Sequence, residues 1–357
     1  LHEVIFPSFS FSISLLTFVH LARLFIYQIF FPRTHITCKP LVVWDIRSSP
    51  ITFDFVWFLF HFANIVSSHG FHDFDLLIYV DKRKVEDLVP QIPGYRNFIS
   101  NDNLLSRIPS LIEPIAFMTS IVGNVILTTS KSEARSLVDH YKTVFPRAYS
   151  PDLFFYSGFD YTSCYSHLFR SNPYFLNLQA CSSSSSQDTS LPKSLLDCKY
   201  ATLSLRDYGF RPHHNTSRLD LSAFLQFCTS HDLIPVIIPD SNLNPFPSLL
   251  SKYPTALLLP QPRKHLSIRA MLYSHSVFNL FSPSGPANLS IHLANTKTII
   301  YNYGIGGYDN SIQPFSSHGA PSGSQYFLAF NCFLLWSSTC PQLTPDALAH
   351  ALSSLSF

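Results

Sequence analysis

The sequence of 357 residues carries little charge, because Asp, Glu, Lys and Arg make up only 13% of it and the formal net charge is +2. A nucleic-acid-binding surface or an acidic tail would need a concentrated charge of one sign, so we expect no nucleic-acid partner and no basic partner. Phe, in contrast, occurs 33 times. This composition is compatible with a place near a membrane or in a large assembly, and equally with a biased genomic composition.

The seven cysteines are irregularly spaced and form no C-x-x-C pair. Neither a zinc ribbon nor a disulfide scaffold is therefore predicted, and most thiols are expected to be buried in a reducing compartment such as the cytoplasm. H-E-x-x-H and G-x-S-x-G are also missing, so zinc protease and serine hydrolase chemistry have no support. Asp73 and Asp75 form a D-x-D pair that we interpret as a turn before a strand. We expect no metal site and no cofactor.

The N-terminal segment over residues 4–31 is almost wholly apolar, although His20 and Arg23 lie inside it. Its length is sufficient to span a bilayer, but the internal charge is unusual for a spanning helix. Two interpretations stay open: an interfacial helix that makes peripheral membrane contact, or a helix that is buried or forms a tail. The first residue is Leu rather than Met, which is compatible with a fragment of a longer chain.

Apolar runs alternate with amphipathic segments in two parts of the chain. The first part predicts strands over 41–46 and 74–81 with a helix from 49 to 70 between them, then a helix over 104–115 and a strand, a turn and a helix over 124–141, capped by Ser130 or Ser132. The second part predicts strands over 200–206, 235–240, 255–260 and 277–282 and a last one over 296–302, with helices over 219–233, 265–275 and beyond 286. Such alternation is typical of parallel sheets with helices on both faces.

We therefore predict an α/β fold with two Rossmann-like domains, preceded by an apolar N-terminal helical segment. The predicted segments are the N-terminal segment (1–39), a first Rossmann-like domain (40–147), a linker with a Ser-rich loop (148–198), a second Rossmann-like domain (199–340) and a C-terminal helix (341–357).

Candidate ligand-binding residues follow the strands of the second domain, because open α/β sheets bind ligands beyond the carboxyl ends of their strands. The loop at 282–288 is the most phosphate-like. Ser284 and Gly285 would offer a hydroxyl and backbone N–H groups where a helix starts near Pro286, with Asn288 in the same turn. The loop is neither a P-loop nor a G-x-G-x-x-G, so an ordinary strand-to-helix turn remains the alternative.

Arg206 and Arg218 are the best cationic candidates, because a guanidinium offers paired donors that suit a diphosphate. The alternative is an ion pair with Asp207 or Asp220. Three further residues complete the candidate set. They are Asn215, Asp240 at the end of its strand, and Arg269, for which an internal ion pair is favoured over an exposed position.

The run from Ser204 to Arg218 and the segment 236–240 resemble bacterial glycosyltransferase-like proteins of surface-polysaccharide clusters. Residues 269–273 and 279–286 share this resemblance, which covers most of residues 40–340. Those proteins look like GT-B folds and are distantly similar to fucosyltransferase-type enzymes. The Arg-Arg pair typical of the fucosyltransferase motif is absent, since Asp207 follows Arg206.

The resemblance implies a nucleotide-sugar donor in the second domain, with its diphosphate at Arg206 and Arg218 and the turn 284–286 over the phosphate or ribose. It places a glycan acceptor on the first domain, with Asp45 and Arg47 facing the cleft. The catalytic base stays open among three carboxylates, of which Asp45 and Asp207 are our candidates and Asp54 is the third.

The predicted function is a metal-independent glycosyltransferase of cell-surface glycan synthesis. A non-catalytic nucleotide- or sugar-binding module, or another polysaccharide-modifying transferase such as a pyruvyl transferase, are the alternatives.

Overall fold

The computed structural model describes residues 38–47, 51–81, 106–147, 149–152, 176, 195, 197–207, 212–240, 246–263, 265–304, 323–325 and 331–355. The apolar segment 4–31 and most of the predicted linker 148–198 lie outside these residues. Among the helices that are described, none is both long enough and apolar enough to cross a bilayer.

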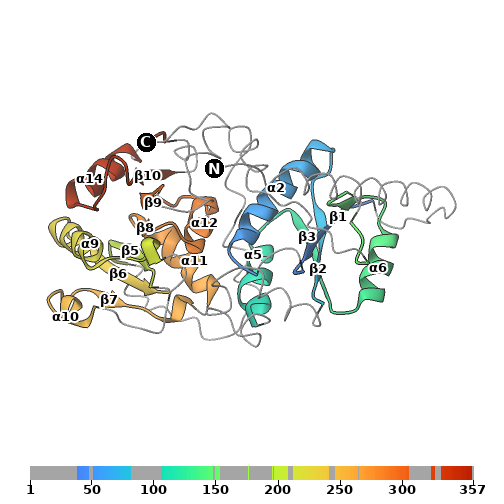
Figure 1. Cartoon of the computed structure of the whole chain (residues 1–357), viewed down its shortest axis with the longest axis horizontal. Helices are drawn as coiled ribbons and strands as arrows, with labels where there is room; N and C mark the ends of the chain where they lie inside the picture. Colours follow the sequence, from blue (N-terminus) through green and yellow to red (C-terminus); the bar gives the residue numbers. More distant parts are fainter. Residues whose placement is uncertain are drawn as a thin grey trace, which may run out of the picture.

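The first half forms a parallel sheet of four strands in the order β3-β2-β1-β4 (Figure 1). Its elements are β1 (Leu41–Asp45), α2 (Asp54–Ser68), β2 (Phe74–Tyr79), the π-helix η1 (Ile108–Ile112), α5 (Glu113–Phe117), β3 (Val122–Thr128), α6 (Lys131–His140) and β4 (Val144–Phe145). β1 and β2 are buried at every residue, as expected of central strands covered on both faces. Ser130 is the N-cap of α6 and accepts a hydrogen bond from Glu133 N at 3.3 Å, which decides between the two predicted caps.

The second half forms a parallel sheet of six strands in the order β10-β9-β8-β5-β6-β7. Its elements are β5 (Tyr200–Leu205), η3 (Pro212–His214), α9 (Arg218–Ser230), β6 (Ile234–Pro239), α10 (Pro247–Leu250), β7 (Leu257–Leu258), η4 (Gln261–Arg263), α11 (Leu266–His275), β8 (Asn279–Phe281), α12 (Gly285–His292), β9 (Thr298–Tyr303), β10 (Cys332–Trp336) and α14 (Pro345–Ser354). The predicted fold class, two Rossmann-like α/β units with parallel sheets, is therefore confirmed. The predicted domain boundaries stay predictions.

Three element predictions need correction. The strand over 296–302 is not the last one, because β10 follows it; a short apolar run such as CFLLW does not reveal its structure by periodicity. The strand predicted over 255–260 is reduced to the two exposed residues of β7 at the edge of the sheet. The helix predicted over 104–115 contains the π-helical stretch η1, in which Pro109 lacks the amide donor of a regular helix.

The two sheets share one central hydrophobic core. In β1, Val42 and Trp44 belong to this core, whereas Leu41 and Val43 point to the opposite face and pack with residues of α6. β6 alternates in the same way, since Val236 belongs to the central core and Ile237 packs with the outer cluster that includes α9 and α14. The inner faces of both sheets therefore contribute to the same cluster of buried side chains.

Four helices fill the space between the sheets. Figure 1 shows α2 and α5 of the first half facing α11 and α12 of the second, and α2 contacts α12 while α5 contacts α11. The Trp57 ring of α2 meets the ring of His292, the last residue of α12, edge-on with centroids 4.6 Å apart. Leu176, which is described although its neighbours in the chain are not, forms bridges to Thr119 of the first half and Leu293 of the second. The halves are thus joined by packed apolar side chains.

The outer edge of β10 is covered by a side chain. The Gln325 carboxamide donates to Leu334 O at 2.7 Å and accepts from Leu334 N at 2.8 Å. Trp336 Nε1 donates to Ser324 O at 3.0 Å, which holds the same segment against the strand. Both backbone groups of Leu334 are therefore satisfied without another strand.

We expect Trp57→Ala to lower the free energy of unfolding by about 3–5 kcal/mol, because a large buried ring is lost from the core that both halves share. Urea unfolding followed by far-UV and near-UV circular dichroism would measure this, and the wild type should unfold in one transition. Leu127→Ala is the control, since Leu127 is 47% exposed and its loss should change stability by less than about 0.5 kcal/mol. Two separate transitions in the wild type would contradict a shared core.

Candidate functional site

Each sheet has a point at which its strand order reverses. In the six-stranded sheet β5 is followed outward by β6 and β7 on one side and by β8, β9 and β10 on the other. In the four-stranded sheet β1 has β2 and β3 on one side and β4 on the other. Ligands of open α/β sheets bind in the crevice outside such a switch point, because the connections leave the sheet there in opposite directions. The two switch points are therefore the candidate sites for ligand binding and catalysis.

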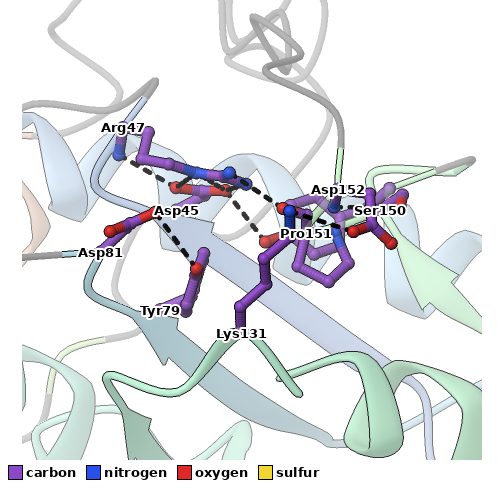
Figure 2. Close-up of polar contacts among 9 residues, drawn as sticks. Asp45, Arg47, Tyr79, Asp81, Lys131, Ser150, Pro151 and Asp152 are labelled. Carbon is purple, nitrogen blue, oxygen red and sulfur yellow. Dashed lines mark hydrogen bonds and ion pairs between the residues drawn. The ribbon is translucent and has the colours of Figure 1, made fainter. Parts of the chain in front are cut away.

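At the switch point of the first sheet, Asp45 and Arg47 form a buried ion pair at the end of β1 (Figure 2). Arg47 Nε lies 2.9 and 3.0 Å from the two carboxylate oxygens, and Arg47 Nη1 donates to Pro151 O at 2.9 Å. Tyr149 Oη donates to Asp45 Oδ2 at 2.9 Å, and the Arg47 guanidinium lies over the Tyr79 ring. Asp45 is thus held by Arg47 and by Tyr149, and Tyr149 ties β1 to the chain that follows β4.

This pairing shifts the acid–base behaviour of the cluster. Burial alone would lower the pKa of Arg47, but the hydrogen bond and charge of Asp45 outweigh it and raise that pKa above its ordinary value. Burial, followed by the neighbouring Asp45 carboxylate, raises the pKa of Tyr149 as well. Arg47 therefore stays charged and Tyr149 stays protonated at physiological pH, which keeps Asp45 engaged.

At the switch point of the second sheet, Arg206 follows the last residue of β5 and is buried. Its backbone is fixed by Thr216, whose N–H donates to Arg206 O at 2.9 Å and whose Oγ1 accepts from Arg206 N at 3.1 Å. Tyr301 Oη donates to the same Thr216 Oγ1 at 3.0 Å. The strand end that carries Arg206 is therefore held rigidly from two neighbouring elements.

The turn into α12 lies at the same switch point, because β8 pairs directly with β5. Ser284 is the N-cap of α12, but its side chain makes no capping hydrogen bond. Ser284 Oγ is shielded from solvent and has no hydrogen-bond partner in the part of the chain that the structure describes. A buried hydroxyl without a partner at the positive end of a helix is suited to bind an anion.

Next to this turn, Asp240 and Arg269 form a second buried ion pair, which confirms the internal pairing favoured for Arg269. Arg269 Nη2 lies 3.1 Å from Asp240 Oδ1, and Arg269 Nε donates to Pro262 O at 3.0 Å. Asp240 also donates its N–H to Leu205 O at 2.9 Å, so the pair is anchored to the end of β5. Burial raises the pKa of the nearby Tyr273 to about 12, and its Oη shares a hydrogen bond with Ser204 Oγ at 2.6 Å.

The other residues predicted to bind the donor lie around this switch point, and they differ in how exposed they are to solvent. Gly285, Pro286 and Asn288 occupy the first turn of α12. Arg218 is the first residue of α9 and is exposed, whereas Asp220 beside it completes a capping box with Ser217. Both residues are described by the structure, and they form no ion pair with each other. The proposed ligand contacts of these residues stay predictions.

Asp207 and Asn215 flank the segment at 208–211 that lies outside the described residues. Asn215 is half-buried and its N–H donates to Pro212 O at 3.0 Å, which closes the turn of η3. Asp207 follows Arg206 and is half-buried. A catalytic role for Asp207 stays a prediction.

Sequence patterns missed the residues that hold the site together. Thr216 and Tyr301 fix Arg206, and Tyr149 fixes Asp45. Tyr149 and Tyr301 act through contacts between residues far apart in the chain, so no local signal marks them. The polar residue Thr216 just before the cap of α9 was the only sequence hint.

Metal ligation finds no support among the described residues, where no group of three His, Cys, Asp or Glu side chains could hold an ion. The Asp73–Asp75 pair has a structural role instead. Asp75 is buried in β2 and accepts from Tyr141 Oη at 2.7 Å and from Asn124 N at 2.9 Å.

No protein-family model matches this sequence, and no curated protein matches it either. Solved structures do resemble it. The heptosyltransferase WaaC of E. coli with ADP-2-deoxy-2-fluoro heptose is 12% identical, covers 88% of this chain and 99% of its own, and has a TM-score of 0.44. The same enzyme with ADP is 11% identical, with 89% and 100% coverage and a TM-score of 0.45.

A glycosyl transferase of family 9 from Veillonella parvula is 10% identical, with 90% and 98% coverage and a TM-score of 0.45. None of these three structures is a fucosyltransferase, so the fucosyltransferase-like part of the sequence resemblance gains no support from them. At such identities and TM-scores the likenesses assign no residue roles.

We expect Asp45→Asn to destabilise the protein by about 3–5 kcal/mol, because it leaves the Arg47 guanidinium buried without its anionic partner. Urea unfolding would measure the loss. Asp152→Asn is the matched control: Asp152 pairs with Lys131 and Arg135 near the surface, and its replacement should change stability by no more than about 1 kcal/mol. A normally stable Asp45→Asn protein that lacks activity would instead mark Asp45 as the base.

Proposed function

We propose that the protein is a glycosyltransferase that moves a sugar from a nucleotide-sugar donor to a glycan acceptor, with the donor diphosphate at the switch point of the second sheet. The observation that carries the proposal is the pairing of β5 with β8. This pairing brings the strand end with Arg206 next to the turn with Ser284 and Gly285, although the two are far apart in the sequence.

This pair of features suits a leaving diphosphate. A guanidinium provides fixed N–H donors and a permanent positive charge. The start of α12 adds backbone N–H groups, the positive end of the helix dipole and the Ser284 hydroxyl. In a step that breaks a sugar–phosphate bond, donors held in place before the reaction stabilise the negative charge that develops on the diphosphate. Such a site needs no metal ion.

The acceptor would lie on the first half, across from this site. Three carboxylates are candidates to take the proton of the acceptor hydroxyl. Asp45 is already bonded to Arg47 and Tyr149, which favours a structural role for it. Asp54 is half-buried in the first turn of α2, directly after Phe53, whose ring reaches Gly285. Asp54 thus directly follows a residue that contacts the donor turn, and Asp207 lies on the donor side.

A non-catalytic nucleotide- or sugar-binding module is the second candidate function, and the engagement of Asp45 favours it. In such a protein the donor site would bind its nucleotide, and the carboxylates would contribute to structure alone. The cytoplasm is the compartment in which we expect either form to work, since nucleotide-sugars are the ligands.

Arg206→Ala should weaken nucleoside diphosphate binding by about 10- to 100-fold, because a charge-assisted contact to the phosphates is lost. Isothermal titration calorimetry with ADP, GDP, UDP and CDP, in buffer with and without EDTA, would measure the affinity. Arg135→Ala, at an exposed ion pair of the first half, is the control and should bind as the wild type does. Unchanged binding by Arg206→Ala would contradict the proposed location of the diphosphate. A loss of binding in EDTA would contradict the proposal that binding needs no metal ion.

Asp54→Asn should reduce kcat by about 10²- to 10⁴-fold and leave donor affinity nearly unchanged, since the base acts on the acceptor and not on the donor. Sugar release from the matching nucleotide-sugar, with a glycan acceptor, would be the assay. Asp207→Asn is the matched variant. If it alone loses turnover, Asp207 is the base; if neither variant does, the base is another group such as Asp45. A wild type that binds the donor but shows no turnover would favour the non-catalytic module.

A further inference from the structure

Phe53 is a residue of the first half that reaches the donor turn of the second. It is the N-cap residue of α2, and no side-chain hydrogen bond caps the helix there. Its half-buried ring lies next to Gly285, the first residue of α12, and also next to the Arg269 guanidinium, whose Cζ is 5.9 Å from the ring centroid. One aromatic side chain therefore contacts both the start of α12 and the Asp240–Arg269 pair.

The contact with Gly285 is so tight that any larger residue would force the Phe53 side chain or the start of α12 to shift. A Cβ atom added at Gly285 would lie 2.9 Å from Phe53 Cδ2, 3.0 Å from its Cβ and 3.2 Å from its Cγ. Gly285 is not among the residues with positive φ, so the backbone does not require glycine there. The requirement comes from Phe53, because the ring and the backbone of α12 occupy adjoining space.

Arg269 is held on its other sides by the second half. Asp240 and Pro262 O accept hydrogen bonds from its guanidinium, and it is only 3% exposed. On the side of the first half, the Arg269 guanidinium lies over the Phe53 ring, whose ring electrons attract the cation. Loss of the ring would remove this contact from a buried charge pair.

The backbone that carries Phe53 is itself fixed. Arg107 Nη1 donates to Ile51 O at 3.2 Å, and Ile51 is almost fully buried. Thr52 O and Phe53 O accept from Phe55 N and Val56 N at 3.2 and 3.0 Å. The place of the Phe53 ring beside the donor turn is therefore fixed by the position of α2.

We propose that Phe53 is a positioning residue that couples the two halves: by packing on Gly285 and Arg269, it sets the place of the α12 start and thereby the affinity of the diphosphate site. This inference rests on the proposed function, since it assigns a determinant to the same site. Phe53 acts through Gly285 and Arg269 and needs no contact with the donor. The candidate base Asp54 directly follows Phe53 in the chain, so donor placement and acceptor activation would depend on one turn of the chain.

A double-mutant cycle on Phe53 and Gly285 tests the proposal. We expect Gly285→Ala to weaken nucleoside diphosphate binding by about tenfold or more, because the new methyl group pushes the α12 start away from the ring. Phe53→Ala should weaken binding by about threefold to tenfold. The double variant should lose less affinity than the two single losses combined, since removal of the ring takes away the contacts with Cδ2 and Cγ and leaves only the contact with the Cβ of residue 53. Calorimetry with ADP, GDP, UDP and CDP would provide the affinities, and urea unfolding of each variant would give its stability.

Two controls separate positioning from general packing. Phe53→Leu keeps an apolar side chain but lacks the aromatic face, and binding between the values of wild type and Phe53→Ala supports the contact with Arg269. Phe117→Ala removes an exposed Phe from α5 of the same half and should not change binding.

Affinities that add up in the double variant, so that it binds more weakly than either single variant, would overturn the inference; the methyl group at Gly285 would then hinder the ligand itself. Failure of the wild type to bind any of the four nucleotides would overturn the proposed function, and with it the inference, and is a different result from additive affinities.

Discussion

The structure depends on the packing of α2, a helix that is apolar on nearly every side. One side of it covers the first sheet through Phe55 and Phe58, which contact Trp44. Its other side meets α12 of the second half, where Trp57 contacts His292. A helix that is buried all round requires partners on all sides, and here those partners come from two different sheets. The relative position of the two halves thus follows from the burial of one segment.

This packing also determines where polar side chains can gather. The inner faces of both sheets are filled by the shared core, and the buried carboxylates Asp45 and Asp240 lie at strand ends instead. Each switch point has a buried arginine–carboxylate pair, Arg47 with Asp45 and Arg269 with Asp240. In the first half the pair joins distant chain segments and uses its donors internally. In the second half the pair supports a neighbouring turn whose Ser284 hydroxyl has no partner among the described residues. Similar pairs therefore serve a structural purpose in one half and border a candidate ligand site in the other.

The sequence revealed the strands and helices with strong periodicity, and with them the two Rossmann-like units. It located Arg206 and Ser284 because both follow buried strands, and the end of an apolar run in the sequence marks the end of such a strand. It could not show that β5 lies beside β8, since the sheet order depends on how the connecting helices pack. For the same reason it could not show that Tyr149, which lies far along the chain, engages the candidate base Asp45. The role of Phe53 was equally hidden, because its partners belong to the other half of the chain.

The Gln325 carboxamide at the edge of β10 also bears on the tendency of the protein to aggregate. An open strand edge invites pairing with a strand of another molecule, which is the first step towards aggregates. By hydrogen bonding to both backbone groups of Leu334, Gln325 occupies the groups with which a strand of another molecule would pair. The chain is rich in Phe and poor in charge, so little electrostatic repulsion keeps copies apart, and this one amide makes the middle of the β10 edge unavailable for such pairing.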